Sequence, residues 1–270
     1  MTTPAPAAGP NQTEADAAPD EIAWADRELA DPHGHAGKAE KVRAMFASIA
    51  RSYDLNNRVH SLWMDQRWRR HAVRAARVRT GDVVVDLACG TGDLTEAFAV
   101  RSGAAKVIGI DYTPEMLDIA RQKREAHGLG HERVEYRVGD ATALDLPDRS
   151  ADVISIAFGI RNVRDPELAV REFARVLRPG GRLVVLEFDR PSLAPVRWFN
   201  AFYSGWLMPR TATLIARDRS GAYRYLPRSV ETFMTRQELA AMIGRNGFGV
   251  LESRPLSLGI CACTAAVRTG

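Results

Sequence analysis

The sequence predicts an α/β protein: a doubly wound, mostly parallel sheet with an antiparallel edge, an N-terminal helical cap and an aromatic insertion after the fifth strand. From residue 83 onward, short β-branched runs alternate with longer amphipathic segments, a pattern typical of helices packed on a parallel sheet. Glycine and proline mark several of the turns between these segments. With 270 residues, 46% of them hydrophobic, the chain is long enough for one domain with a full core.

The first 37 residues differ from the rest in composition. They are rich in Ala and Pro and hold seven acidic residues and one Arg, so we expect residues 1–37 to form a disordered acidic tail. This tail has the plan of neither a secretory signal nor a transit peptide. Because it carries a net −6 in a chain of net charge +4, residues 38–270 carry +10. Such a charge indicates association with anionic partners rather than a particular chemistry.

The elements of the domain over residues 38–270 follow in order. Residues 38–80 have a helical period and several aromatics, and we expect them to form a helical cap. Thr113-Pro114 and Asp165-Pro166 are strong helix starts, and the RPGG run that ends at Gly181 is a clear stop and turn. The expected parallel strands are VVVDL (83–87), KVIGI (106–110), RVEYRV (133–138), DVISIAF (152–158) and RLVVLEF (182–188).

The insertion at residues 190–233 is dense in aromatic residues. Core packing is the commoner role of such side chains, but their density in one segment favours an apolar acceptor pocket with Trp198 and Phe202 in its wall. A helix over 236–246 follows, and the runs FGVLESRPL and LGICACTAAV indicate an antiparallel strand pair at one edge of the sheet.

The three cysteines are an odd count in a chain with no recognisable signal peptide, which favours reduced thiols and a cytoplasmic setting. Cys261 and Cys263 lack a second pair of ligands, so we expect no metal site. No apolar run approaches the roughly 18 residues that span a bilayer, so we expect a soluble or peripheral protein.

The turn DLACGTGDL after the first expected strand predicts a ligand site, because ligands bind beyond the carboxyl ends of parallel strands. Gly90 and Gly92 would allow a tight turn and close approach to a ligand, although glycines alone can simply close such a turn. A dinucleotide site normally has a third glycine where this chain has Thr95. Carboxylates at Asp86 and Asp93 would repel a diphosphate and attract a cation, which favours S-adenosylmethionine.

Two more carboxylates follow the next strands. Asp111 ends the second strand, where it can accept hydrogen bonds from ribose hydroxyls, and Asp140 follows the third, facing an adenine amino group. Each alone could be a helix cap or a solvated turn residue. Acidic residues after three successive strands, beside a glycine turn, favour a cofactor site instead.

Four longer motifs carry a resemblance to a known family: KVRAMFASIARSYDLNNRVHSLWMDQRWRR, VVVDLACGTGDLTEAFA, FGIRNVRDPELAVREFARVLRPGGRLVVLEF and YRYLPRSV. From about Lys41 to its end the chain resembles the ubiquinone/menaquinone biosynthesis C-methyltransferases, which have the Rossmann-like class I S-adenosylmethionine-dependent methyltransferase fold. The resemblance implies cofactor contacts at Thr91, Asp111, Asp140 and Ala141, and Ala157 stands where some relatives have a cofactor-contacting Ser. The predicted cofactor site therefore comprises Asp86, Gly90, Thr91, Gly92, Asp111, Tyr112, Asp140, Ala141 and Ala157. Trp63 stands where relatives commonly have Gly.

The resemblance also implies where the chemistry takes place. Arg161 and Asn162, just beyond the fourth strand, would stabilise a phenolate on the acceptor; otherwise Arg161 would pair with a surface acid and Asn162 would cap the next helix. Tyr53 would line the acceptor site and relay a proton. His60 and His71 are weaker candidates for a base, because an isolated helical His is usually a packing or surface residue.

The predicted function is transfer of a methyl group from S-adenosylmethionine to a ring carbon of a polyprenylated quinol, with demethylmenaquinol as the expected acceptor. The alternatives are benzoquinol methylation in ubiquinone synthesis, O-methylation of a small molecule, and a non-catalytic S-adenosylmethionine-binding module. AFGIRN replaces the DPPY-like stretch of many nucleobase methyltransferases, so no nucleic-acid partner is expected. Peripheral membrane contact through the substrate and an oligomeric state stay open.

Overall fold

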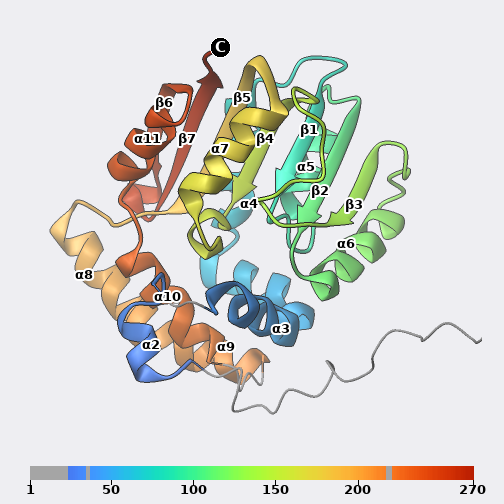
Figure 1. Ribbon diagram of the computed structural model, residues 1–270. Helices are drawn as coiled ribbons and strands as arrows, with labels where there is room; N and C mark the ends of the chain where they lie inside the picture. Colours follow the sequence, from blue (N-terminus) through green and yellow to red (C-terminus); the bar gives the residue numbers. More distant parts are fainter. Residues whose placement is uncertain (1–23, 35–36, 217–220) are drawn as a thin grey trace, which may run out of the picture.

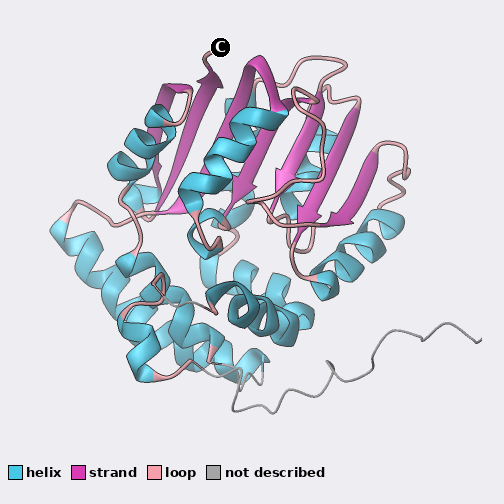
Figure 2. Ribbon diagram, in the orientation of Figure 1, coloured by secondary structure: helices cyan, strands magenta, loops and turns pink. Residues whose placement is uncertain are grey.

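The computed structural model describes residues 24–34, 37–216 and 221–270. Seven strands form one sheet in the order β3-β2-β1-β4-β5-β7-β6, with helices around it (Figures 1 and 2). The first five strands pair in parallel, whereas β7 runs antiparallel to both β5 and β6. This confirms the predicted doubly wound sheet with an antiparallel edge. The strands are β1 (Val83–Leu87), β2 (Lys106–Asp111), β3 (Val134–Val138), β4 (Ala151–Ala157), β5 (Leu177–Phe188), β6 (Phe248–Leu256) and β7 (Cys261–Arg268).

The largest difference from the expected strand bounds is at the start of β5. The RPGG run was expected to separate a helix from a strand beginning at residue 182, but β5 already begins at Leu177. Gly180 turns within it at φ +75, and the pairing of β4 with β5 shifts its register between Ala151 and Val153. The turn is therefore an irregularity inside a paired strand.

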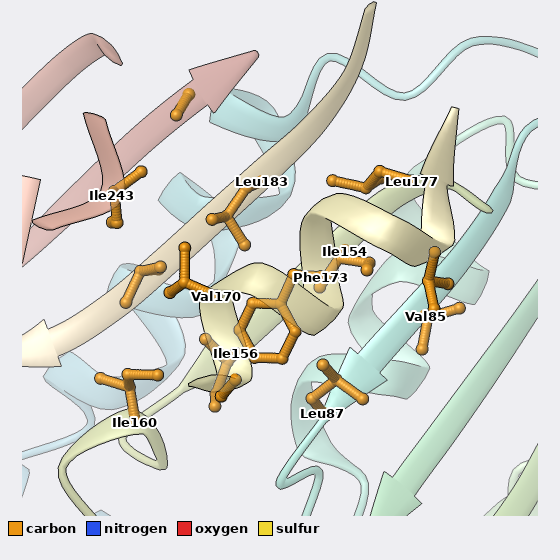
Figure 3. Packing of buried hydrophobic residues seen from close by; sticks show 14 of the residues in the cluster. Val85, Leu87, Ile154, Ile156, Ile160, Val170, Phe173, Leu177, Leu183 and Ile243 are labelled. Atoms are coloured by element: carbon orange, nitrogen blue, oxygen red, sulfur yellow. The ribbon is translucent and has the colours of Figure 1, made fainter. Parts of the chain in front are cut away.

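Helices cover both faces of the sheet (Figure 1). On one face, α7 places Ala169, Val170, Phe173 and Val176 against the sheet, a spacing that lies on one side of a helix. Figure 3 shows Phe173 among side chains of β1, β4 and β5. The helices on this face are α7 (Pro166–Val176) and α11 (Arg236–Arg245). Those on the other face are α4 (Met64–Ala76), α5 (Asp93–Arg101) and α6 (Pro114–Ala126).

A helical cap lies beyond the carboxyl ends of the parallel strands (Figure 1). Its own apolar cluster includes Met45, Ile49, Tyr223 and Tyr225. Only α3 of the expected 38–80 cap belongs to it, because α4 turns Trp68 and its apolar neighbours onto the sheet. The cap consists of α2 (Asp26–Ala30), α3 (Lys38–Ser61), α8 (Ala194–Phe202), η3 (Tyr203–Leu207), α9 (Met208–Ala216) and α10 (Ala222–Thr232).

Part of the expected disordered tail over residues 1–37 is ordered, since residues 24–34 include the helix α2. Trp24 is buried in the cap and stacks on Tyr225, with ring centroids 4.3 Å apart. Burial of this one tryptophan supplies apolar contact area that stabilises the segment. The average composition of residues 1–37 did not indicate it. The rest of the predicted tail, residues 1–23, 35 and 36, lies outside the described residues.

The three cysteines are free thiols, as expected. Among residues 24–34, 37–216 and 221–270, no group of three or more metal-ligating side chains lies close enough to hold an ion. In the same part of the chain, no helix combines the length and apolarity needed to cross a membrane.

Candidate active site

Two neighbouring cavities lie between the carboxyl ends of the strands and the cap. The smaller, which we call the cofactor cavity, has a volume of about 120 Å³. Loops after β1, β2, β3 and β4 form much of its wall, and α3 closes it with residues such as Val42 and Phe46. Six predicted cofactor contacts line it: Gly90, Asp111, Tyr112, Asp140, Ala141 and Ala157.

Asp111 is the best-supported residue of this cavity. Its carboxylate, 9% exposed, accepts hydrogen bonds of 2.8 Å from the backbone N–H groups of both Gly90 and Thr113. Burial raises the pKa of Asp111, and the two N–H donors oppose that shift. Each carboxylate oxygen has a second lone pair, so the fixed side chain can still accept hydrogen bonds from a ligand's hydroxyls.

The two glycines of the turn have different roles. Gly90 has φ +55, and an added Cβ would meet no atom within 4 Å, so its surroundings leave room for a ligand. Gly92 has φ +84, and its Cβ would lie 2.2 Å from the Tyr136 hydroxyl oxygen. Gly92 does not line the cavity. Its lack of a side chain is required by packing against Tyr136 rather than by ligand approach.

The structure does not support Asp86 and Asp93 as the charges that attract the cofactor. Asp86 is fully buried outside the cavity wall and accepts hydrogen bonds of 2.6 Å from Thr95 and Ser155. Burial raises its pKa to about 6. Asp93 is paired with Arg58 of α3 and Lys123 of α6. The acidic groups that do line the cavity are those of Asp111 and Asp140.

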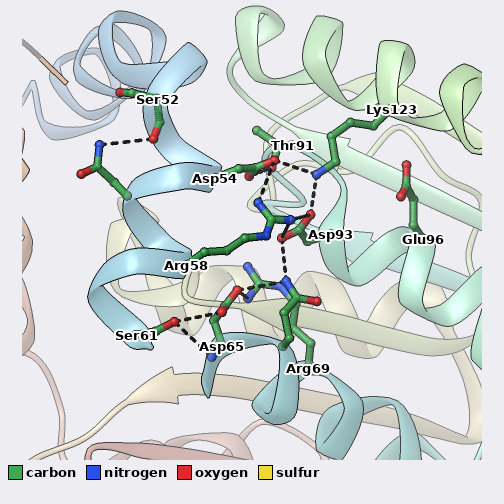
Figure 4. A network of polar contacts seen from close by, with 12 residues as sticks. Ser52, Asp54, Arg58, Ser61, Asp65, Arg69, Thr91, Asp93, Glu96 and Lys123 are labelled. Atoms are coloured by element: carbon green, nitrogen blue, oxygen red, sulfur yellow. Dashed lines mark hydrogen bonds and ion pairs between the residues drawn. The ribbon is translucent and has the colours of Figure 1, made fainter. Parts of the chain in front are cut away.

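Asp54 of α3 binds the glycine turn to the cap (Figure 4). Thr91, predicted as a cofactor contact, lies outside the cavity wall and donates its hydroxyl to Asp54 at 2.5 Å. Lys123 of α6 donates to Asp54 at 2.8 Å and also contacts Asp93. Arg58 lies within 3.7 Å of Asp54 and 3.4 Å of Asp93. This network holds α3 over the turn.

The larger, acceptor cavity has a volume of about 400 Å³ and lies between α3, α4, the insertion and the ends of β4 and β5. Its aromatic wall comes from Trp68, Phe158 and Phe188, whose ring centroids are 4.7 to 6.2 Å apart. Trp198 and Phe202, expected in this wall or in the core, are in neither: they are 75% and 48% exposed. The insertion lines the cavity instead with the opposite side of the same helices, including Asn200, Tyr203 and Ser204.

Tyr53 and Phe158 line both cavities. Phe158 has φ +58, a conformation that is strained for a side chain of this size, and its N–H donates to the carbonyl of Leu186 at 2.7 Å. Burial raises the pKa of Tyr53, so its hydroxyl stays protonated. The predicted acceptor-site residue Tyr53 thus lies at the boundary between the two cavities.

Arg161 and Asn162 follow β4, but they face different cavities. Arg161 lines the acceptor cavity and pairs at 2.6 Å with Glu187, each side chain only 3% exposed. It also donates to Ser229 at 3.2 Å. Asn162 lines the cofactor cavity, and its side-chain oxygen accepts a hydrogen bond of 3.0 Å from the Tyr225 hydroxyl. Arg161 does not pair with a surface acid, because its partner Glu187 is buried. Asn162 does not cap the next helix, because the N-cap of α7 is Asp165.

His60 is the strongest candidate for a base in the structure, although the sequence alone ranks it as a weaker one. The Tyr203 hydroxyl donates to the backbone carbonyl of His60 at 3.0 Å, and the His60 Nδ1 lies 3.2 Å from the same hydroxyl oxygen. Because that hydroxyl has one proton, Nδ1 carries the imidazole hydrogen and Nε2 keeps a lone pair. Burial lowers the pKa of His60. His71, the other candidate, does not line the cavity.

Several residues that line the acceptor cavity carry buried polar atoms without hydrogen-bond partners in the described part of the chain. Three buried atoms of residues that line it have no partner among the described residues: His60 Nε2, Asn56 Oδ1 and Arg69 Nε. Buried polar atoms are nearly always satisfied in folded proteins. The arrangement therefore fits a ligand that brings hydroxyl or carbonyl groups into an otherwise aromatic pocket.

Lys38 is a buried basic residue hydrogen-bonded to the loop after β4, and the sequence did not indicate it. Its ammonium group is buried and donates to the carbonyls of Arg161 and Val163 at 2.8 Å each. Burial lowers the pKa of Lys38 to about 8. No local motif marks this lysine, because its partners lie more than 120 residues away in the sequence.

Solved structures first define the class of protein. The chain superposes with a TM-score of 0.62 on a putative methyltransferase in complex with the Haloferax volcanii Trm112 activator, at 19% identity, covering 83% of this chain and 98% of that one. It superposes with a TM-score of 0.64 on the [4+2]-cyclase SpnF, at 17% identity, covering 86% and 96%. The fold is that of the Rossmann-like methyltransferases, and the cyclase shows that this fold alone does not fix a reaction.

The chain belongs to the ubiE/COQ5 methyltransferase family, which matches residues 35–268. It is 45% identical to the demethylmenaquinone methyltransferase of Thermus thermophilus, over 81% of this chain and 97% of that protein. It is 40% identical to the ubiquinone/menaquinone biosynthesis C-methyltransferase UbiE of Cronobacter sakazakii, over 83% and 89%. The predicted family, enzyme class and S-adenosylmethionine dependence are confirmed.

The cofactor cavity fits S-adenosylmethionine. Asp111, with its free lone pairs, is suited to the ribose hydroxyls, and the open side of Gly90 leaves room for close approach. The cofactor carries both an ammonium and a carboxylate. The cavity wall includes an acidic side chain, Asp140, and a basic side chain, Arg43. Residues suited to both the ammonium and the carboxylate of the cofactor are therefore present.

Proposed function

We propose that this protein transfers a methyl group from S-adenosylmethionine to a ring carbon of a polyprenylated quinol, with demethylmenaquinol as its preferred acceptor. The names of the relatives favour this acceptor, since those of Thermus thermophilus and Deinococcus radiodurans, 45% and 41% identical, are both demethylmenaquinone methyltransferases. The substrate is lipid-like, so we also infer that the protein meets it at a membrane surface.

The observation that carries the proposal is the shared wall. Tyr53 and Phe158 separate a cavity with strand-end carboxylates from an aromatic cavity with unfilled polar positions. A methyl donor in the first and a planar acceptor in the second would meet across these two side chains. Such positioning supplies much of the rate acceleration in a bimolecular transfer.

The aromatic residues would hold the acceptor ring. Trp68, Phe158 and Phe188 offer ring faces and edges to a flat quinol, an arrangement that aromatic pairs favour. The orphan atoms of Asn56 and Arg69 are suited to its oxygen atoms. A bare aromatic pocket could bind many flat molecules, so these polar positions orient the quinol.

His60 would act as the general base. Its Nε2 lone pair accepts the proton of one quinol hydroxyl, leaving a phenolate whose negative charge spreads to the ring carbons. Arg161, already paired with Glu187, keeps guanidinium N–H groups that would stabilise this charge. When bound, S-adenosylmethionine supplies the electrophilic methyl group. The methylated carbon would then lose its hydrogen as a proton to water while His60 returns its proton to the ring oxygen, which restores the aromatic quinol.

The decisive experiment measures methyl transfer with purified protein and short-tailed quinols. Demethylmenaquinol and the corresponding benzoquinol are compared in kcat/KM, and the methylated position is identified by mass spectrometry and NMR. We expect carbon methylation with a higher kcat/KM for demethylmenaquinol. A preference for the benzoquinol would move the assignment to ubiquinone synthesis, and methylation at oxygen would overturn it.

Calorimetry of S-adenosylmethionine binding completes this test. Asp111→Ala should weaken cofactor binding by about 1 to 3 kcal/mol, the usual range for hydrogen bonds to a charged group. Tight binding without turnover on any quinol would instead indicate a non-catalytic binding module.

A further inference from the structure

A row of large apolar side chains is exposed on the outer side of the helices that wall the acceptor cavity. Trp198, Phe202 and Trp206 are 75%, 48% and 50% exposed. Their spacing of four residues places them on one helix face, and their rings stack in sequence with centroids 6.5 and 5.4 Å apart. Phe199 beside them is 61% exposed. Such a continuous aromatic row is unusual on a surface that contacts only water.

A second exposed apolar element adjoins the insertion that carries this row. Leu62 and Trp63 connect α3 to α4 and are 78% and 59% exposed. Both have left-handed backbone conformations, with φ +50 and +59, which are strained for residues with a Cβ. His60 contacts Tyr203 of η3, so this connection adjoins the insertion. The backbone turn closes α3, since the Trp63 N–H donates to the Arg58 carbonyl at 3.0 Å, and it leaves both side chains exposed.

The charged residues of the segment that carries the row have one sign. Residues 190–216 contain three arginines and no acidic residue. Arg197 is exposed beside Trp198, and the Arg210 guanidinium lies 4.7 Å from the centre of the Trp206 ring. Aromatic residues on one face of a helix, with arginines among them, are typical of helices that lie in the interface of an anionic membrane.

We propose that the protein docks through this surface onto an anionic lipid membrane, with the rings at the level of the headgroups. We call this surface the aromatic face. It consists of Leu62, Trp63, Trp198, Phe199, Phe202 and Trp206.

A second copy of the chain fits the aromatic face less well than a membrane does. A two-fold contact would bring the same arginines together, and the 190–216 segment has no acid to compensate them.

The docking explains how a lipid-borne acceptor would reach its cavity. Asn200, Tyr203 and Ser204 line the acceptor cavity from the same helices that carry the aromatic face. A docked protein therefore holds this cavity about one helix diameter, roughly 10 Å, from the headgroups. This explanation rests on the proposed quinol substrate, whereas the docking itself does not.

The test is vesicle flotation with the full chain and without any quinol. Vesicles of phosphatidylcholine with and without phosphatidylglycerol are compared for the wild type, a Trp198→Ser/Phe202→Ser variant and a matched control, Val100→Ser/Leu251→Ser. The control residues are 65% and 56% exposed on other elements. We expect phosphatidylglycerol to increase binding of the wild type, an at least tenfold loss of affinity in the first variant, and no change in the control.

Tryptophan fluorescence locates the contact. Lipids brominated near the headgroup should quench the exposed Trp63, Trp198 and Trp206 on binding, while Trp24 and Trp68, 2% and 5% exposed, stay unquenched. Equal vesicle binding by both variants would overturn the proposal. So would a wild type that ignores vesicles and forms a dimer broken by Trp198→Ser/Phe202→Ser. Vesicle binding in a protein that methylates no quinol would reject only the proposed function.

Discussion

The two cavities share a wall but are built differently. In the cofactor cavity, both oxygens of Asp111 are already satisfied by backbone N–H groups at the ends of paired strands. In the acceptor cavity, polar atoms of His60, Asn56 and Arg69 have no partner within the described parts of the chain. In the cofactor cavity the protein itself holds the key carboxylate in place, whereas in the acceptor cavity several polar atoms still lack partners among the described residues.

This difference teaches where substitutions should act. Residues under the cofactor cavity are part of the sheet's hydrogen bonding and packing, so changing them should cost folding stability. The acceptor-cavity residues with an unpartnered atom should contribute less to folding, so changing them should mainly cost turnover. The predictions below test this division, from the largest expected effect to the smallest.

The largest effect is expected for His60→Asn. Loss of a general base typically lowers the rate 10²- to 10⁴-fold, so kcat should fall within that range while S-adenosylmethionine affinity and unfolding free energy change little. Wild-type activity should rise with pH through an apparent pKa below 6.5, because burial favours the neutral imidazole. His71→Asn is the matched control and should keep both the rate and the pH profile. A His60→Asn enzyme with normal kcat would remove His60 from the mechanism.

Arg161→Ala should affect both properties, because Arg161 belongs to the acceptor cavity and to a buried ion pair. Removing one partner of such a pair costs about 3 to 5 kcal/mol, and Glu187 would be left unpaired at 3% exposure. Denaturant unfolding measures this loss. The double variant Arg161→Met/Glu187→Gln should recover most of the stability without recovering kcat. Recovery of kcat as well would make Arg161 a purely structural residue.

Asp86→Asn should remove a pH dependence of folding. The folded-state pKa of Asp86 is raised from 3.8 to about 6 by burial, so the protonated form favours folding. That contribution is complete below pH 3.8 and is lost as the pH rises through 6, about 3 kcal/mol at 1.36 kcal/mol per pKa unit. The unfolding free energy of the wild type, relative to Asp86→Asn, should fall by this amount between pH 3.5 and pH 7. Parallel pH curves for the two proteins would contradict the assignment.

The cofactor cavity could be predicted from the sequence much better than the acceptor cavity. Strands and the Asp111 position follow from local patterns, because alternating β-branched runs and acids after strands are readable within a few residues. The partners of Arg161, Lys38 and His60 are 26 to 143 residues away in the chain, and no local pattern encodes such distances.

The aromatic insertion shows the limit most clearly. Its density of aromatics predicts a pocket wall or core, but one helix can expose its large side chains and line a cavity with its small ones. Which face turns inward is decided by contacts such as that between Tyr203 and His60. The aromatic wall of the acceptor cavity comes instead from Trp68, Phe158 and Phe188, which belong to three separate elements.

The smallest effects come from the two glycines of the turn, which test the division within a single loop. Gly92→Ala should destabilise the fold by about 2 kcal/mol, because it adds backbone strain at φ +84 and places a Cβ 2.2 Å from the Tyr136 hydroxyl oxygen. Gly90→Ala meets no neighbour within 4 Å, so it should cost only the strain, about 1 kcal/mol.

Cofactor affinity should show the reverse order, because Gly90 lines the cofactor cavity and Gly92 does not. Chemical unfolding and calorimetry on both variants give the two measurements. A Tyr136→Phe background provides the control: it removes the hydroxyl that the new Cβ would strike, so Gly92→Ala should cost less there, whereas Gly90→Ala should cost the same. If Gly92→Ala lost more cofactor affinity than Gly90→Ala while staying folded, Gly92 would be a ligand-contacting residue as the sequence first suggested, and the division between packing and binding within this turn would fail.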